Sequence, residues 1–180
     1  PLGAGVDGET LNINGENASS ISYTGCPGLA GLEDQTASLV ELSAGVSYTI
    51  TANFGTCGGN YTGVGEIWID YDGRETFDPS ESIGTWSGMA PSGIQSYNFT
   101  VPPAAVADTH RMRVIQAEGG TLPLDPCASF FYGSAVDFSV VISAGTNCNG
   151  IPSAGTTAGD STTCDAFTVS NTGATSAVGI

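Results

Sequence analysis

Hydrophobic and polar residues alternate along several short stretches of the chain, the pattern of β-strands that bury one face. In the stretch 46–54, for example, Tyr48, Ile50 and Phe54 share one face, while Ser, Thr and Asn occupy the other. The same period of two recurs in other segments. Strands are predicted at 11–14, 20–24, 38–42, 46–54, 67–71, 95–101, 110–117 and 136–142.

Turn-forming residues separate these segments at short intervals. The chain holds 26 Gly and 9 Pro in 180 residues, and no stretch has a sustained helical period. Strands at such spacing are typical of sandwiches and barrels. The sequence therefore predicts an all-β fold, an antiparallel β-sandwich that is jelly-roll-like in length.

The composition changes after Ile142. The segment 143–163 is rich in Gly, Ser and Thr, and a short strand-like run follows it at 166–170. We place a domain boundary near Ala144, which predicts a sandwich over 1–144. Residues 145–180 are then a linker with the beginning of a following β module, and we expect the chain to be part of a larger protein.

The charge balance is strongly acidic. Eighteen Asp and Glu oppose three basic residues, all of them Arg, for a formal net charge of -15. Binding to nucleic acid draws its affinity from Lys and Arg, so nucleic acid is excluded as a partner, and an anionic membrane surface is disfavoured. No apolar run approaches the roughly 20 residues of a membrane span, so we expect no membrane insertion in this segment.

The five cysteines lack the paired C-x-x-C spacing of zinc and redox motifs. Disulfides in an oxidising, extracellular setting are the better interpretation. Cys148 and Cys164 flank the Gly/Ser/Thr-rich segment and form the most natural local pair. Among Cys26, Cys57 and Cys127 three pairings are open and one thiol is left over; we favour Cys26 with Cys57.

An acidic segment directly after the predicted strand 67–71 is the best candidate for chemistry. Calcium takes six to eight oxygen ligands, and carboxylates spaced along a loop can supply them. The candidate ligands are Asp70, Asp72, Asp78 and Glu81. Arg74 occupies a position that is usually acidic in such loops. The alternative is a solvated acidic turn in which Arg74 pairs with a neighbouring carboxylate. Calcium is the only cofactor that the sequence suggests.

Two of the three arginines lie two positions apart. Arg111 and Arg113 therefore share a strand face, and we expect a structural ion pair with Asp70 or Asp137. The single histidine, His110, points to the opposite face. No Gly-x-Ser-x-Gly run accompanies it. The sequence thus favours a protein that is not an enzyme.

Trp68 and Trp86 could form an aromatic platform on which a sugar stacks. Burial in a core or an interface is the commoner role of tryptophan. The two alternatives differ in one observable, the exposure of the indole rings.

Three runs together resemble one family. They are Ile67-Trp-Ile-Asp-Tyr-Asp-Gly73, Thr109-His-Arg-Met-Arg-Val114 and Tyr132-Gly-Ser-Ala-Val-Asp-Phe-Ser-Val140. In this order they resemble the GEVED domain, over roughly residues 19–143. Gly133 and Asp137 match the naming motif and Phe138 stands for its usual Tyr, but Ser134 and Val136 replace its two glutamates.

The resemblance implies a module of large secreted or surface-anchored proteins, of Bacteroidetes type, exported to the cell surface. The tail from Cys148 resembles the opening of an Ig-like repeat of such proteins. We expect a non-catalytic structural or adhesion module of a cell-surface or filament protein. Its partners would be neighbouring domains or copies of the same protein, and glycans are a further candidate. The alternative is a carbohydrate-binding accessory module of a secreted enzyme.

Overall fold

The computed structural model describes residues 9–26, 31–56, 58–145, 167–169 and 177–179. Contacts within the chain divide it into two compact units, Pro1–Ala144 and Gly145–Ile180. In the second unit, β10 (Phe167–Val169) pairs antiparallel with β11 (Ala177–Gly179).

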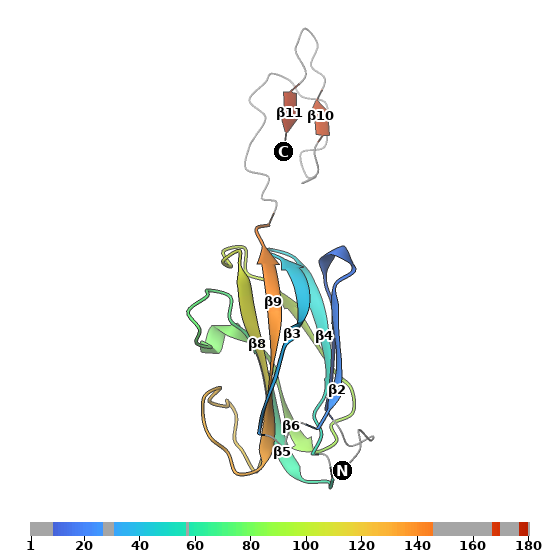
Figure 1. Ribbon diagram of the computed structural model, residues 1–180, viewed down its shortest axis with the longest axis vertical. Helices are drawn as coiled ribbons and strands as arrows, with labels where there is room; N and C mark the ends of the chain where they lie inside the picture. The colour runs from blue at the N-terminus through green and yellow to red at the C-terminus, as the bar shows by residue number, and fades with distance from the viewer. Residues whose placement is uncertain (1–8, 27–30, 57, 146–166, 170–176, 180) are drawn as a thin grey trace. The chain divides into compact units, whose positions relative to one another are not determined.

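The first unit is a sandwich of two β-sheets, as predicted (Figure 1). The four-stranded sheet has the order β2-β1-β4-β7, with β1 Glu9–Asn14, β2 Ser20–Gly25, β4 Ser47–Asn53 and β7 Gln95–Thr100. The five-stranded sheet has the order β3-β9-β8-β5-β6, with β3 Leu32–Ser43, β5 Thr62–Ile69, β6 Ser82–Met89, β8 Thr109–Glu118 and β9 Gly133–Ser143. Among the described connections, η1 (Glu16–Ala18) and η3 (Pro79–Glu81) are short 3-10 helices.

One strand pair departs from the predicted antiparallel arrangement. β3 runs parallel to β9, whereas the other pairs are antiparallel. A parallel pair needs a long connection between its strands, and here the chain passes through both sheets between β3 and β9. The five-stranded sheet is therefore a mixed sheet, with one parallel and three antiparallel strand pairs among its described strands.

The sequence pattern missed β6 because glycines interrupt its apolar period. From Gly84 to Met89 the half-buried positions are Gly84, Trp86 and Gly88, and the positions between them are exposed. Only the tryptophan carries an apolar side chain, so no alternation is visible. β3 was also predicted too short, since it begins at Leu32.

The main core fills the space between the two sheets. Its fully buried side chains include Ile13, Ile50, Phe54, Ile67, Met112, Phe138 and Ile142. Burial of side chains of this size contributes about 1.5–3 kcal/mol each. The alternating residues of the predicted strands supply this core.

A second apolar cluster covers the outer face of the five-stranded sheet. Trp68, Ile115 and Ala135 form it, and Phe77, Leu124 and Phe130 from the connecting loops pack against it. β5 is consequently buried on both faces. Its polar side chain Glu66 is also enclosed, where it accepts hydrogen bonds from the Ser82 hydroxyl (2.6 Å) and the Leu124 amide (2.9 Å).

Gly65 of β5 is required because the ring of Phe54 lies directly against its backbone. A Cβ at this position would lie 2.4 Å from the ring, and the position of Phe54 is also fixed by its stacking on Trp86, with 5.5 Å between the ring centres. We expect Gly65→Ala to lower the free energy of unfolding by about 1–3 kcal/mol in urea denaturation. Ser87→Ala, on the exposed side of β6, should change it by less than about 0.5 kcal/mol. Equal effects of the two changes would contradict this packing.

Candidate functional site

The acidic loop between β5 and η3 is anchored to the outer apolar cluster through Phe77. The ring of Phe77 lies 6.3 Å from that of Trp68, and the Arg113 guanidinium carbon lies 5.4 Å from its centre. The loop projects beside β8 (Figure 1). Its position is thus fixed by packing and by a cation–π contact.

Asp70 and Glu81 are the buried carboxylates of this loop, with exposed fractions of 4% and 5%. Asp70 accepts hydrogen bonds from the amides of Gly73 (2.7 Å) and Glu75 (3.1 Å). Glu81 accepts them from the amides of Tyr71 (2.7 Å) and Asp78 (2.8 Å). Backbone amides therefore orient both carboxylates.

The structure brings three of the four predicted calcium ligands together. One carboxylate oxygen each of Asp70, Asp72 and Glu81 lie within 4.8 Å of one another. Asp78 lies outside this group, at the N-cap position of η3. Arg74 pairs with Asp72 at 3.2 Å and approaches Asp78 at 3.6 Å, as the alternative interpretation of the segment expected.

His110 lies beside this loop and is only 5% exposed. Its Nε2 lies 2.7 Å from the Val106 carbonyl oxygen, which can only accept, so Nε2 carries the proton. The other ring nitrogen, Nδ1, is then an acceptor. It is buried and has no hydrogen-bond partner among the described residues. A cleft joins His110 with Asp70 and Asp72.

The two neighbouring arginines meet at one buried carboxylate. Arg113 donates to both oxygens of Asp137 at 2.7 Å and to the Pro126 carbonyl at 2.9 Å. Arg111 reaches the same carboxylate at 3.2 Å, but its side chain is 54% exposed against 16% for Arg113. The hydrogen bonds to Asp137 raise the pKa of Arg113. Of the two partners considered from the sequence, both arginines contact Asp137.

The two tryptophans do not form an exposed platform. Trp68 is 2% exposed in the outer cluster. Trp86 is half-buried and stacks on Phe54. Trp68 therefore has no free face for a sugar.

Among the described cysteines, Cys127 is an exposed free thiol. The predicted pair Cys148–Cys164 lies outside the described residues. The pair Cys26–Cys57 involves Cys57, which also lies outside them.

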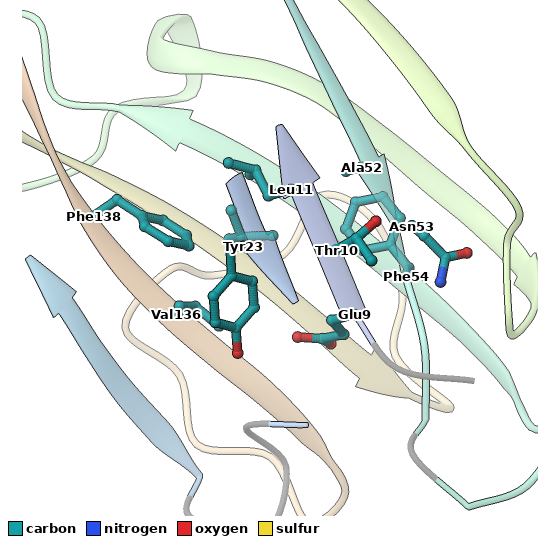
Figure 2. Close-up of a pocket in the computed structure, with 10 residues that line it drawn as sticks. Glu9, Thr10, Leu11, Tyr23, Ala52, Asn53, Phe54, Val136 and Phe138 are labelled. Atoms are coloured by element: carbon teal, nitrogen blue, oxygen red, sulfur yellow. The ribbon is translucent and has the colours of Figure 1, made fainter. Parts of the chain in front are cut away.

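The sequence analysis missed Glu9, a carboxylate enclosed between the two sheets. Glu9 is 6% exposed and accepts a hydrogen bond from the Ser134 hydroxyl of the opposite sheet. Figure 2 shows its carboxylate near the ring of Tyr23, and both residues line one small cavity. Burial raises the pKa of Glu9 to about 8, and the charge of Glu33 adds to this.

The cavity beside Glu9 has a volume of about 10 Å³, the space that roughly one water molecule needs. It is a packing gap, too small for a ligand. The signal for this buried acid was its place in the alternation: Glu9 shares a strand face with Leu11 and Ile13.

Two aromatic side chains that the sequence analysis did not single out are fully or largely exposed. Phe131 is 101% exposed and Tyr132 is 71% exposed, in the loop before β9. They border a shallow depression that Asp125 and Glu118 also line.

The comparison with known families bears on the five-stranded sheet. Residues 65–141 match the family model of the GEVED domain. The chain carries a GEVED match. The matched segment begins in β5 and ends in β9, so it includes the acidic loop, Asp137 and both of its arginines. No curated protein matches the chain.

β9 is the motif strand, since it carries the residues that correspond to the GEVED motif, 133–138. Residues on both of its faces have structural roles. Asp137 faces the outer side and holds Arg113. Ser134 and Val136, which stand at the positions of the two motif glutamates, face the other sheet. The carboxylate of Glu9, from β1, contacts Ser134. Glu9 thus places an acidic group next to position 134, where β9 carries a serine instead of the glutamate of the motif.

No helix of the described residues has the length and apolar character of a membrane span.

Proposed function

We propose that this chain is a non-catalytic, load-bearing β-sandwich module of an extracellular cell-surface or filament protein. The observation that carries the proposal is the position of the first and the last described strands of the sandwich. Glu9, the first described residue, contacts Ser134 at the start of β9. The unit's last strand ends at Ser143, at the other end of β9. The two points are therefore separated by the length of this strand, about 35 Å for its 11 residues.

A tensile force applied through the chain would run along the strands. β1 would be pulled by its first residue and β9 by its last, in opposite directions. Each of these strands has a hydrogen-bonded neighbour on both sides: β1 lies between β2 and β4, and β9 lies between β3 and β8. Extracting either strand therefore requires many ladder hydrogen bonds to break together, which makes forced unfolding slow.

The charged groups of the module support a structural role. Asp137 is occupied by two arginines, and Asp70 and Glu81 are oriented by backbone amides. His110 donates through Nε2 to the Val106 carbonyl, a contact that orients its ring and ties β8 to the segment before it. These groups stabilise loops and strands.

The acidic composition supports an extracellular setting. A net charge of -15 keeps an exposed module soluble and apart from nucleic acid and anionic membranes. By the resemblance of the sequence, the parent protein is a Bacteroidetes-type surface protein in which an Ig-like repeat follows Cys148. The partners are then neighbouring domains or copies of the same protein, and disulfides would brace the module.

Antibodies against the purified chain test the location. Intact cells that make the parent protein should be labelled as strongly as permeabilised cells, and protease added outside should remove the label. A cytoplasmic protein probed in parallel should be labelled only after permeabilisation. Labelling of the chain that required permeabilisation would overturn the extracellular assignment.

A second candidate function is glycan binding, favoured by the exposed rings of Phe131 and Tyr132. Aromatic faces stack on sugars, and the nearby carboxylates of Asp125 and Glu118 can accept hydrogen bonds from hydroxyl groups. This site differs from the predicted one, since Trp68 is buried. In this interpretation the chain is an accessory module of a secreted enzyme or a glycan-binding adhesin.

A glycan array distinguishes the two candidates. Under the second candidate the wild-type chain retains glycans, and a Phe131→Ala/Tyr132→Ala double variant loses at least about tenfold in affinity. Trp86→Phe is the matched control, because it keeps the stack on Phe54. Absence of retention, or equal retention by the double variant, would contradict glycan binding at this depression.

A further inference from the structure

We propose that the acidic loop binds one divalent cation, with Asp70, Asp72 and Glu81 as its protein ligands and His110 beside them as acceptor for a water on the ion. The three carboxylates approach within 4.8 Å of one another, a separation that a single ion can bridge. The inference is independent of the load-bearing function, because it concerns only this loop.

The charge balance of the loop favours a cation. Two of the carboxylates are buried, and like charges at such short separation repel one another. The basic group that pairs with the loop is Arg74, which is 69% exposed and reaches Asp72 and Asp78 rather than the two buried acids. Each carboxylate oxygen that accepts an amide hydrogen still has a second lone pair for a metal ion.

An independent observation comes from the strand next to the loop. His110 is only 5% exposed. Its Nδ1 is an acceptor that has no hydrogen-bond partner among the described residues. A buried acceptor without a donor is costly and calls for an explanation. A Cβ built on Gly73 would lie 3.5 Å from the Cε1 of His110 and 3.9 Å from Nδ1, so this edge of the ring faces the loop. A water molecule coordinated to the ion would donate the missing hydrogen bond.

The donor set selects the class of ion. Three carboxylates without thiolate are hard ligands, which suit calcium or magnesium better than zinc or copper. Calcium accepts irregular geometry and six to eight oxygens, so it tolerates ligands held by backbone turns. Magnesium demands a near-ideal octahedron. We therefore assign the site to calcium, with water completing the coordination.

Calorimetry and thermal unfolding on the whole chain test the site. After chelator treatment and dialysis, calcium should bind with a stoichiometry of one and raise the melting temperature. Magnesium at the same ionic strength controls for screening of the acidic surface and should raise it less. A shift that magnesium reproduces in full contradicts the assignment to calcium, and no shift with calcium overturns the proposed site.

Two variants of the loop distinguish the ligands. Asp72→Asn keeps the acceptor for the Arg74 amide but removes one ligand charge, and should weaken calcium binding by about tenfold or more. Asp78→Asn makes the same change of charge outside the cluster and keeps a residue suited to cap η3, so calcium binding should persist. Equal loss in both variants, or equal binding by both and the wild type, would overturn this ligand assignment.

Terbium emission gives a readout that does not depend on stability. Terbium should occupy the calcium site and be sensitised by excitation of Tyr71, which lies between two of the ligands in the sequence. Calcium should displace it from the wild type and from Asp78→Asn. Emission from Asp72→Asn as strong as that of the wild type would contradict the site.

Discussion

Asp137→Asn is expected to lower the free energy of unfolding by about 3–5 kcal/mol, because it leaves a largely buried guanidinium without its counter-charge. Arg113 donates to both oxygens of Asp137, and its side chain is 16% exposed. An asparagine of the same size can accept only part of these hydrogen bonds and carries no charge. Urea denaturation of the wild type and the variant at neutral pH measures the loss.

Arg111→Ala is the matched control for this prediction. Arg111 reaches the same carboxylate, but its side chain is 54% exposed, and exposed ion pairs contribute about 0–1 kcal/mol. Its removal should therefore cost less than about 1 kcal/mol. A loss for Asp137→Asn no larger than that for Arg111→Ala would show that the buried pair does not stabilise the motif strand.

Glu9→Gln is expected to stabilise the protein, by roughly 3 kcal/mol at pH 7. In the folded protein the pKa of Glu9 is raised to about 8 by burial, against 4.5 for an unperturbed glutamate. The folded state therefore keeps a proton that the unfolded chain releases. Stability from this group is fully present below about pH 4.5 and falls as the pH rises to about 8. Glutamine keeps an acceptor for Ser134 and has no charge to bury.

The pH profile of unfolding checks this prediction. Wild-type stability should decline between about pH 4.5 and 8, and Glu9→Gln should remove the part of the decline that belongs to this group. Glu75→Gln makes the same change of charge at an exposed position and should leave the profile unchanged. Parallel profiles of the wild type and Glu9→Gln would contradict the burial of a protonated Glu9.

The sandwich could be predicted because apolar and polar residues alternate visibly along most of its strands. Tyr48, Ile50 and Phe54 alternate with polar residues, and their side chains meet the core as expected. β6 could not be predicted, since Gly84 and Gly88 replace the apolar residues that would reveal it. The parallel pair of β3 and β9 follows from long-range pairing, on which local alternation carries no information.

The sequence could show which residues belong to the candidate site, but not how their side chains are arranged in space. Spacing placed Asp70, Asp72, Asp78 and Glu81 in one loop, but only the fold shows that Asp78 caps a short helix instead of joining the cluster. Burial of Trp68 follows from loops that fold over the outer face of the five-stranded sheet. Glu9 escaped notice because its significance depends on a contact with Ser134, 125 residues away.

Single-molecule force spectroscopy tests the load-bearing function most directly. With handles joined at Glu9 and Ser143, force loads β1 and β9 along their length. With bio-orthogonal handles at Thr62 and Met89, which face each other at the end of the β5–β6 ladder, force opens that edge one hydrogen bond at a time. The account predicts that the first geometry needs a force several times larger than the second at the same loading rate. Unfolding through Glu9 and Ser143 at a force equal to or below that of the edge geometry would contradict it.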